Sequence, residues 1–291
     1  MERMKKITNF LEKIMNVLFT LCGFLAVAFV ILITGFLVVS GMPAIKEIGI
    51  VDFLFGTEWA STASTPSYGI LPFILTSVYG TLGAMIVGVP LGLLCAIFID
   101  KMAKEKAAGL IRSAVDLLSG IPSVVYGLVG MILVVPFVRE AFGLPDGANL
   151  FSAILVLTIM ILPSVISVSE TAIRAVPKEY EEASLALGAT KIETVFKVIV
   201  PAAKSGIVTA VVLGIGRSIG EAMAVMMVAG NVANMPGIFK SVRFLTTAVA
   251  SEMSYSSGLQ REALFSIALV LFVFILGINL VLNLIVKKEK K

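Results

Sequence analysis

The chain has 291 residues, of which 58% are hydrophobic and 14% are charged; the mean hydropathy is +1.03 and the formal net charge is +4. A soluble domain of this composition would expose large apolar patches, so the chain is expected to be a multi-span membrane protein. It has no histidine, and its two cysteines, Cys22 and Cys95, lie inside apolar runs. The sequence therefore argues against a histidine or multi-cysteine metal site and against a disulfide framework.

Six apolar segments are long enough to cross a bilayer as helices, which requires about 20 residues each. In chain order they cover Ile14–Ser40, Leu71–Ile99, Leu117–Val138, Leu150–Ser169, Ser205–Val232 and Ala263–Val286. Continuous runs of this length are typical of helices, because the strands of a membrane barrel alternate in segments of about ten residues. The expected fold class is an all-α membrane protein with six transmembrane helices.

Small residues recur every four positions in the second segment, at Gly80, Ala84, Gly88 and Gly92. Such a stripe allows two helix backbones to approach each other closely. It predicts a packing face of this helix and carries no information about a substrate.

The positive charges between the segments predict the orientation in the membrane. Seventeen of the 23 lysine and arginine residues lie at the two termini and in the second and fourth connections, against five in the other connections. Because cytoplasmic loops carry an excess of positive charge, both termini are expected in the cytoplasm. The basic composition is then a signal of topology, and no nucleic-acid partner is expected.

The fifth segment contains two charged residues, Arg217 and Glu221, which are one helical turn apart and share a helix face. Each lone charge would cost about 2.5–3.5 kcal/mol at the centre of a span, so both need a partner or a wet cavity. One interpretation is a structural ion pair that locks this helix to its neighbours. The other assigns Arg217 to a substrate anion, because the planar guanidinium suits an oxyanion, and assigns Glu221 to neutralising Arg217 until the substrate competes.

The connection from Glu170 to Lys204 is too long to be a plain turn between two spans. It is charged with both signs but keeps helical apolar spacing, and Gly188 and Pro201 mark a break and a restart. This pattern predicts a short amphipathic helix–turn–helix in the cytoplasm. From the pattern alone it serves equally well as a docking surface for a partner protein or as a helix on the membrane surface.

The same connection resembles the coupling loop of ABC importer permeases. The match consists of Glu182-Ala183-Ser184, then Gly188, then Pro201, with Ser184 in place of a second alanine. In that family the short helix of the loop sits in a cleft of the ATPase subunit and transmits its closure. The resemblance favours the docking interpretation and implies that these five residues serve the coupling to an ATPase.

Two further strings are similar to phosphate importer permeases of the PstC type. They are Gly120-Ile121-Pro122-Ser123-Val124-Val125-Tyr126-Gly127 and Gly216-Arg217-Ser218-Ile219-Gly220-Glu221-Ala222-Met223-Ala224. The resemblance implies a type I ABC importer (MetI-like) permease core at 71–286 with its coupling loop at about 170–204. An N-terminal part at 1–70 precedes this core, and a basic cytoplasmic tail at 287–291 follows it. The implied activity is import of inorganic phosphate, with Arg217 and Glu221 on the translocation path.

The resemblance also implies the partners and the location. They are a second, homologous permease of the PstA type, a dimer of ATPase subunits of the PstB type and an extracytoplasmic phosphate-binding protein, all at the cytoplasmic membrane of a prokaryote. ATP and magnesium are expected in the partner ATPase, because this sequence lacks a Gly-x4-Gly-Lys-Ser/Thr phosphate loop. The chain itself is expected to be a transport subunit without a cofactor and not an enzyme.

One departure from the family concerns the residue after the glutamate, which is commonly threonine and is Ala222 here. Ser218 lies one helical turn earlier, and we hypothesise that it replaces the lost hydroxyl beside the anion. Ser218→Ala should then slow phosphate uptake.

Residues of the outer loops, namely Asp52, Trp59, Arg243 and Glu252, are candidates for contact with the binding protein, and Trp59 is equally well explained as a plain anchor at the membrane interface. Two alternative functions stay open. One is a permease for sulfate, molybdate or another oxyanion. The other is a self-sufficient secondary transporter, for which inverted repeats would be expected and none is found.

Overall fold

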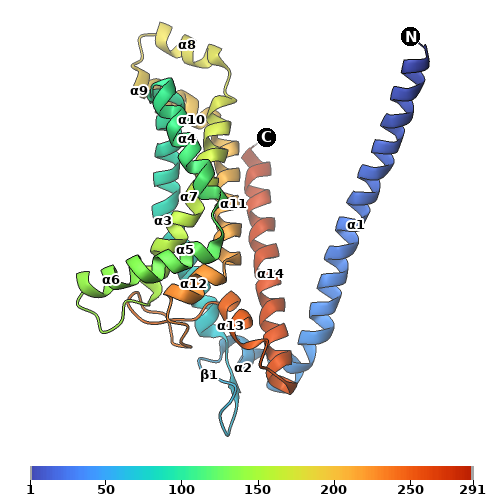
Figure 1. Ribbon diagram of the computed structural model, residues 1–291, viewed down its shortest axis with the longest axis vertical. Coiled ribbons are helices and arrows are strands. Elements are labelled where there is room, and N and C mark those ends of the chain that lie inside the picture. The colour runs from blue at the N-terminus through green and yellow to red at the C-terminus, as the bar shows by residue number, and fades with distance from the viewer. Residues whose placement is uncertain (1, 290–291) are drawn as a thin grey trace.

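The computed structural model describes the backbone of residues 2–289 and the side chains of residues 12–280 (Figure 1). This part of the chain is mainly helical, with one two-stranded sheet. The basic side chains that precede residue 12 and those of the predicted tail at 287–291 lie outside the described residues.

The helices follow the apolar segments of the sequence, with several breaks. The α-helices are α1 (Glu2–Ile48), α2 (Ile50–Phe55), α3 (Leu71–Ile97), α4 (Glu105–Gly120), α5 (Ser123–Val129), α6 (Val135–Ala141), α7 (Leu150–Arg174), α8 (Lys178–Ala186), α9 (Lys191–Thr194), α10 (Val200–Ala202), α11 (Lys204–Gly220), α12 (Met223–Val228), α13 (Leu245–Glu252) and α14 (Gly258–Glu289). The π-helical segments are η1 (Phe98–Met102), η2 (Gly130–Val134) and η3 (Val195–Ile199). The strands β1 (Trp59–Ala60) and β2 (Ser67–Tyr68) pair antiparallel.

The number of membrane spans agrees with the sequence. Within the described chain, five helical stretches are long and apolar enough to cross a membrane, and a sixth is counted if Lys191–Ala202 and Lys204–Gly220, which meet at 71°, form one span. The predicted fifth segment, Ser205–Val232, is wrong as a single helix, because α11 ends at Gly220 and α12 starts at Met223. The all-α, six-span fold class holds, with a break inside the most informative span.

The stripe of small residues on α3 packs against α7, as the sequence predicts. A Cβ atom built on Gly88 would lie 2.6 Å from Cδ1 of Ile161, and one built on Gly92 would lie 2.7 Å from Cγ1 of Val165. Ala84, between the glycines, has no exposed surface. The two glycines therefore leave room for branched residues of α7, and α3 and α7 together form the centre of the bundle.

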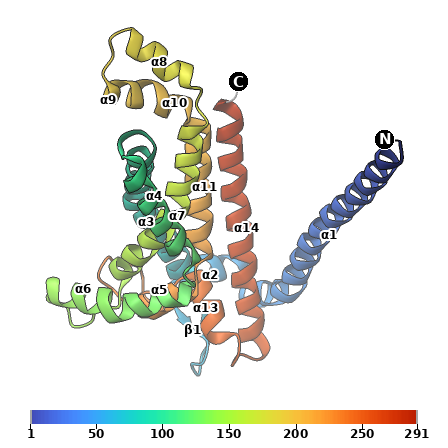
Figure 2. The same ribbon diagram turned by 45° about the horizontal axis from the view of Figure 1, so that its top comes forward.

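Helices α5 and α6 run across the bundle and not along it, as both views show (Figures 1 and 2). The predicted third segment, Leu117–Val138, is therefore wrong as a single helix. The break follows Gly120, where Ile121 is extended (φ −71°, ψ 128°) and Pro122 comes next. The proline ring disfavours a helical conformation of the preceding residue, so α4 ends there and the chain changes direction.

The N-terminal end of α1, the C-terminal end of α14 and helix α8 all lie at one end of the molecule, whereas β1 and β2 lie at the other (Figure 1). Helix α1 meets α14 near that second end, where the hydroxyl of Ser266 donates to the carbonyl oxygen of Gly41 at 2.6 Å. This arrangement puts the two termini and the connection that contains α8 on the same side, as the charge distribution requires.

Candidate functional site

The candidate site lies where α11 ends. Gly220 is the last residue of α11, Glu221 is extended (φ −73°, ψ 129°), and Ala222 precedes α12. A Cβ atom built on Gly216 or Gly220 would meet nothing within 4 Å. The face of α11 that carries these two glycines is therefore open, and the backbone there is accessible.

Arg217 lies in the last turn of α11 and is half-buried. Its Nη1 donates a hydrogen bond to the hydroxyl of Ser164 on α7, at 3.2 Å. A guanidinium has five N–H donors, so this contact leaves most of them for another acceptor. Sequence reasoning missed Ser164, because a single hydroxyl in an apolar helix gives no signal and its partner is 53 residues away.

Glu221 caps α12. Its Oε1 accepts a hydrogen bond from the backbone N–H of Ala224 at 2.9 Å, and its carbonyl oxygen accepts one from the hydroxyl of Thr246 at 2.7 Å. A carboxylate in this position satisfies one of the free N–H groups at a helix N-terminus and complements the helix dipole. The side chain is 9% exposed.

The ion pair considered for Arg217 and Glu221 does not form. Among the ion pairs of residues 12–280, none joins these two side chains. Their placement on one helix face assumed a continuous helix, and the helix ends between them. An extended residue directs its side chain away from the face that a helical one would share, so Arg217 turns to α7 and Glu221 turns to α12.

Ser218 points away from Arg217. It is 2% exposed, and its hydroxyl lies 3.4 Å from that of Thr81 on α3. Successive residues of a helix point about 100° apart, so neighbours in sequence face different partners. Because α11 ends before Ala222, Ser218 and Ala222 do not share a helix face, and the premise for a replaced hydroxyl is not met.

Helix α5 fixes the position of α12. Its Tyr126 donates a hydrogen bond from the phenol to the carbonyl oxygen of Leu118, at 2.7 Å, and so bridges the break at Pro122. A Cβ atom built on Gly127 would lie 2.8 Å from Cα of Ala224, so the two helices touch at their backbones. The two segments that resemble phosphate importer permeases, 120–127 and 216–224, thus lie together at the N-terminal end of α12.

The connection between α7 and α11 contains the exposed helix α8, which confirms the predicted helix–turn–helix. Helix α7 continues to Arg174, beyond the predicted start of the connection, and none of the nine residues of α8 is buried. Gly188 follows with a φ of +89°, in the left-handed region that favours glycine. Pro201 lies in α10, the last element before α11. The glycine and the proline therefore end and restart the helical path as expected.

Among the residues whose side chains are described, two polar contacts join α8 to other elements. The hydroxyl of Ser184 lies 2.9 Å from that of Thr194 in α9, and Nζ of Lys101 lies 2.8 Å from the carboxylate of Glu181. Ser184 resembles alanine in size, but alanine lacks this contact. Glu182 and Ala183, the other residues of the string, are exposed.

An ordered series of alternating charges, here called the charge chain, lies between α8 and α4. Glu170 is 7% exposed and accepts hydrogen bonds from Nε of Arg112, at 2.6 Å, and from Nη2 of Arg174. Arg174 also pairs with Asp100, at 3.1 Å. Lys101 lies 3.5 Å from Asp100 and continues to α8. Its members in order are Arg112, Glu170, Arg174, Asp100, Lys101 and Glu181.

The chain matches a known protein family over most of its length. The family model described as "Binding-protein-dependent transport system inner membrane component" matches residues 88–291. The chain belongs to this family. The match includes α8, the charge chain and the end of α11 that carries Arg217, so these features lie within the part that defines the permease family.

Curated relatives cover nearly the whole permease. The probable ABC transporter permease protein YqgH of Bacillus subtilis is 39% identical and covers 89% of this chain and 87% of its own length. The phosphate transport system permease protein PstC of Haemophilus influenzae is 33% identical, with 94% and 91% covered. PstC of Pasteurella multocida is also 33% identical, with 82% and 81% covered.

Solved structures share the fold of the permease. The inward-facing MetNI methionine ABC transporter has a TM-score of 0.57 at 21% identity, with 76% of this chain and 94% of that chain covered. A bacterial alginate ABC transporter, in complex with its periplasmic protein bound to an alginate pentasaccharide, has a TM-score of 0.57 at 16% identity, with 87% and 86% covered. These likenesses establish the MetI-like type I importer fold.

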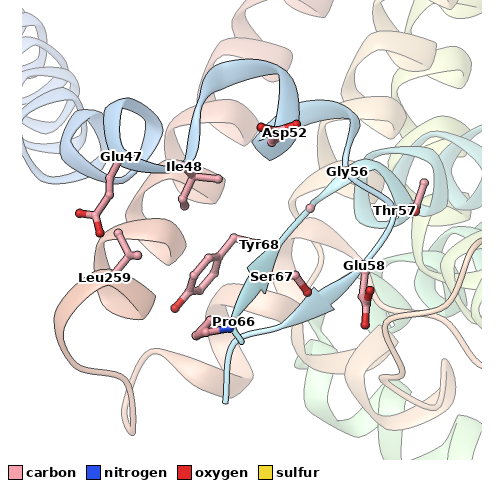
Figure 3. A pocket seen from close by; sticks show the side chains of 11 residues that line it. Glu47, Ile48, Asp52, Gly56, Thr57, Glu58, Pro66, Ser67, Tyr68 and Leu259 are labelled. Carbon is pink, nitrogen blue, oxygen red and sulfur yellow. The ribbon is translucent and has the colours of Figure 1, made fainter. Parts of the chain in front are cut away.

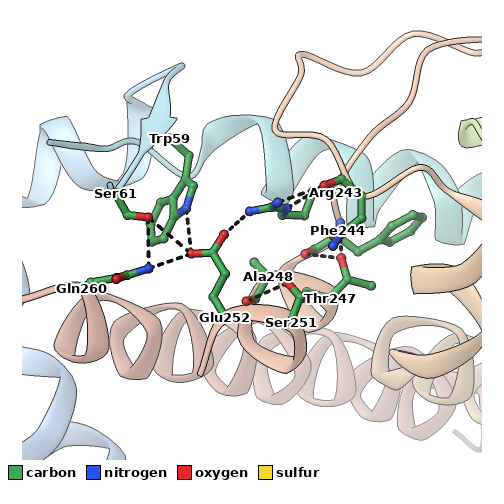
Figure 4. A network of polar contacts seen from close by, with 10 residues as sticks. Trp59, Ser61, Arg243, Phe244, Thr247, Ala248, Ser251, Glu252 and Gln260 are labelled. Carbon is green, nitrogen blue, oxygen red and sulfur yellow. Dashed lines mark hydrogen bonds and ion pairs between the residues drawn. The ribbon is translucent and has the colours of Figure 1, made fainter. Parts of the chain in front are cut away.

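Three of the four outer-loop candidates contact one another within the permease (Figure 4). Glu252 accepts hydrogen bonds from Nε1 of Trp59 at 3.3 Å and from Nε2 of Gln260 at 3.2 Å, and it pairs with Nη1 of Arg243. Arg243 also donates to the carbonyl oxygen of Asn231 from Nε and Nη2, at 3.1 and 2.9 Å. Trp59 is 8% exposed, so it is a packed residue and not an anchor facing lipid.

The fourth candidate, Asp52, lines a pocket of about 500 Å³ beside the strands (Figure 3). The side chains of Glu47 and Glu58 also line it, which makes the pocket acidic. Burial, and then the charge of Glu47, raise the pKa of Tyr68 in its wall. Within the described residues, no group of three or more histidine, cysteine, aspartate or glutamate side chains has the geometry to hold a metal ion.

Proposed function

We propose that the chain is the permease subunit of an ATP-driven importer that moves inorganic phosphate across the cytoplasmic membrane. The observation that carries this proposal is helix α8, none of whose residues is buried, with Glu182 and Ala183 exposed on its surface and Gly188 in a left-handed turn behind it. A helix of this kind is suited to dock into a partner. Relatives named as phosphate transport permeases, at 33% identity over most of the chain, support phosphate as the cargo.

Arg217 is the residue that we place on the translocation path. Its half-buried guanidinium keeps donors beyond the one that Ser164 receives, and the open glycines of α11 leave room beside it for an oxyanion. Glu221 serves the path by holding the start of α12, and Ser218 serves it by packing α11 against α3. A single arginine compensates only part of the charge of phosphate, so a second permease chain has to supply further donors.

The proposed partners follow from this role. A second permease of the PstA type would complete the path, two ATPase subunits of the PstB type would dock on α8, and an extracytoplasmic phosphate-binding protein would deliver the substrate. Glu182, Ala183, Ser184, Gly188 and Pro201 form or shape the docking segment, and ATP with magnesium would bind the partner ATPase. No cofactor is assigned to this chain.

The proposed setting is the cytoplasmic membrane of a prokaryote, with lipid around the spans and with both termini and α8 in the cytoplasm. The proposed division of the chain is an N-terminal helix and outer loop at 1–70, a permease domain at 71–286 with its coupling segment at about 170–204, and a basic tail at 287–291. Two observations support it: both termini lie at the end that carries α8, and the family match starts at residue 88.

The deciding experiment measures ATP hydrolysis by the complex that co-purifies with this chain, reconstituted in lipid with its external binding protein. Phosphate, sulfate and molybdate are supplied in turn. Stimulation by phosphate alone supports the proposal, and stimulation by another oxyanion would overturn the substrate but keep the mechanism. Transport by the chain without any co-purifying ATPase would overturn the mechanism and favour a secondary transporter.

A further inference from the structure

Helix α8 is not held in place by burial of an apolar face. None of its residues is buried, and Leu187, just after its end, is 90% exposed. Helices of globular proteins are usually oriented by an apolar stripe that packs against a core. The orientation of α8 must therefore depend on other contacts.

The contact through Ser184 joins α8 to the segment that leads into α11. Its partner Thr194 is 1% exposed and ends α9, whose start is fixed by a capping box between Thr190 and Glu193. From Thr194 the chain continues through η3 and α10 directly into α11. A movement of α8 that is transmitted through Ser184 thus reaches the helix that carries Arg217.

The contact through Glu181 joins α8 to the charge chain. Lys101, its partner, lies in η1 at the end of α3, and both side chains are partly exposed, at 15% and 26%. Through Asp100 and Arg174 the charge chain reaches the buried Glu170 of α7, and Arg112 ties α4 to the same carboxylate. The second contact thus links α8 to three further helices.

The two contacts share one face of α8. Glu181 and Ser184 are three residues apart and therefore lie on the same side of a helix, whereas Glu182 and Ala183 are exposed on the other. Holding the first face inward presents the second face outward. At each end of α8 the helical conformation stops, because Pro177 is extended and Gly188 is left-handed, so α8 does not continue as a helix into α7 or α9.

We propose that Glu181 and Ser184 are positioning residues that make α8 move as one body with the membrane helices. This inference rests on the proposed function, in which a partner ATPase moves α8. Without the two contacts, α8 would turn or tilt in response to the ATPase and would transmit less of its movement. ATP would then be hydrolysed without the matching transport of phosphate.

The test compares phosphate uptake with ATP hydrolysis in the same vesicles, using the complete complex and radiolabelled inorganic phosphate. The variants are Ser184→Ala, Glu181→Ala and the double variant. A net hydrogen bond changes an equilibrium by about two- to tenfold, so each single variant should lower the phosphate carried per ATP within that range, and the double variant should lower it further. Ser184→Thr, which keeps a hydroxyl, should restore the ratio.

Matched controls separate this role from a general loss of helix or charge. Glu105→Ala removes a carboxylate from an exposed position in the first turn of α4, and Ser113→Ala removes a hydroxyl whose hydrogen bond, among the described residues, goes to Gly109 of its own helix α4. Both should keep the wild-type ratio.

Two results would overturn the inference: an unchanged ratio in the double variant, or loss of the ATPase subunits from its complex, which would make the residues docking contacts. If wild-type vesicles show no ATP hydrolysis that responds to phosphate, the proposed function fails instead, and the two failures are thereby distinguished.

Discussion

Glu221 has two features that substitutions can separate: it accepts a hydrogen bond at the start of α12, and it carries a negative charge. Glu221→Ala removes the acceptor for the N–H of Ala224, which lies 2.9 Å from Oε1 at a residue that is 9% exposed. Loss of an N-cap costs about 0.5–2 kcal/mol. Leaving a buried donor without a partner costs about 1–3 kcal/mol. The two ranges are alternative estimates for the loss of the same hydrogen bond, so they are not added. We therefore expect the free energy of unfolding to fall by about 1–2 kcal/mol.

Glu221→Gln separates the cap from the charge. The amide oxygen of glutamine accepts the same hydrogen bond, but the bond becomes a neutral one of about half the strength. The loss of unfolding free energy should then stay below about 1 kcal/mol. Glu140→Ala, at a side chain with 74% exposure, serves as the control and should change stability little.

The assay is thermal unfolding of the purified complex, with phosphate uptake measured in parallel. The expected order of melting temperature is wild type, then Glu221→Gln, then Glu221→Ala. A melting temperature of Glu221→Ala equal to that of the wild type would refute the capping role. Loss of uptake in Glu221→Gln at full stability would show that the negative charge itself acts on the path.

Three other substitutions test the site. Arg217→Gln should abolish phosphate uptake while the ATPase still co-purifies, because no ion pair among the described side chains depends on this arginine; loss of assembly would contradict the pathway role. Gly127→Ala should destabilise the complex by about 1–3 kcal/mol, because the new Cβ would lie 2.8 Å from Cα of Ala224. Gly109→Ala, which meets nothing within 4 Å, should not do so, and equal melting temperatures would contradict this packing argument. Ser218→Ala should lower stability by about 1 kcal/mol and leave the KM for phosphate unchanged, because its hydroxyl faces a buried threonine. A raised KM would indicate that the hydroxyl of Ser218 contacts the anion.

Local properties of single residues explain which structural features could be predicted from the sequence. Gly88 and Gly92 lack side chains at the positions where α7 approaches, and Gly80 lacks one where the ring of Phe244 approaches, so their spacing alone predicted a packed face. Gly188 takes a left-handed conformation that other residues avoid, and it ends the helical path of α8 as its place in the string suggested. In these cases the decisive property belonged to one residue or to one helical period, whereas the break at Pro122, which is also local, was missed because the apolar run continues through it.

Prediction failed where a distant segment decided the outcome. At the end of α11, the carbonyl oxygen of Glu221 accepts a hydrogen bond from the hydroxyl of Thr246, which is 25 residues away. Trp59 and Glu252 are separated by 193 residues and yet share a hydrogen bond, which the sequence did not indicate. The periodicity of apolar residues along a helix does not predict contacts between residues that are far apart in the sequence.

The amino-acid sequence was sufficient to identify an all-α membrane protein of about six spans with an exposed connection before α11, because a bilayer demands long apolar runs and an uneven distribution of positive charge, and both can be counted along the chain. Which side chains meet could be seen only in the folded bundle. It separated Arg217 from Glu221 and gave Arg217 the hydroxyl of Ser164. It also tied α8 to Lys101 and Thr194. The physical reason is that a buried polar group must find a partner, and in a bundle the nearest one belongs to another helix.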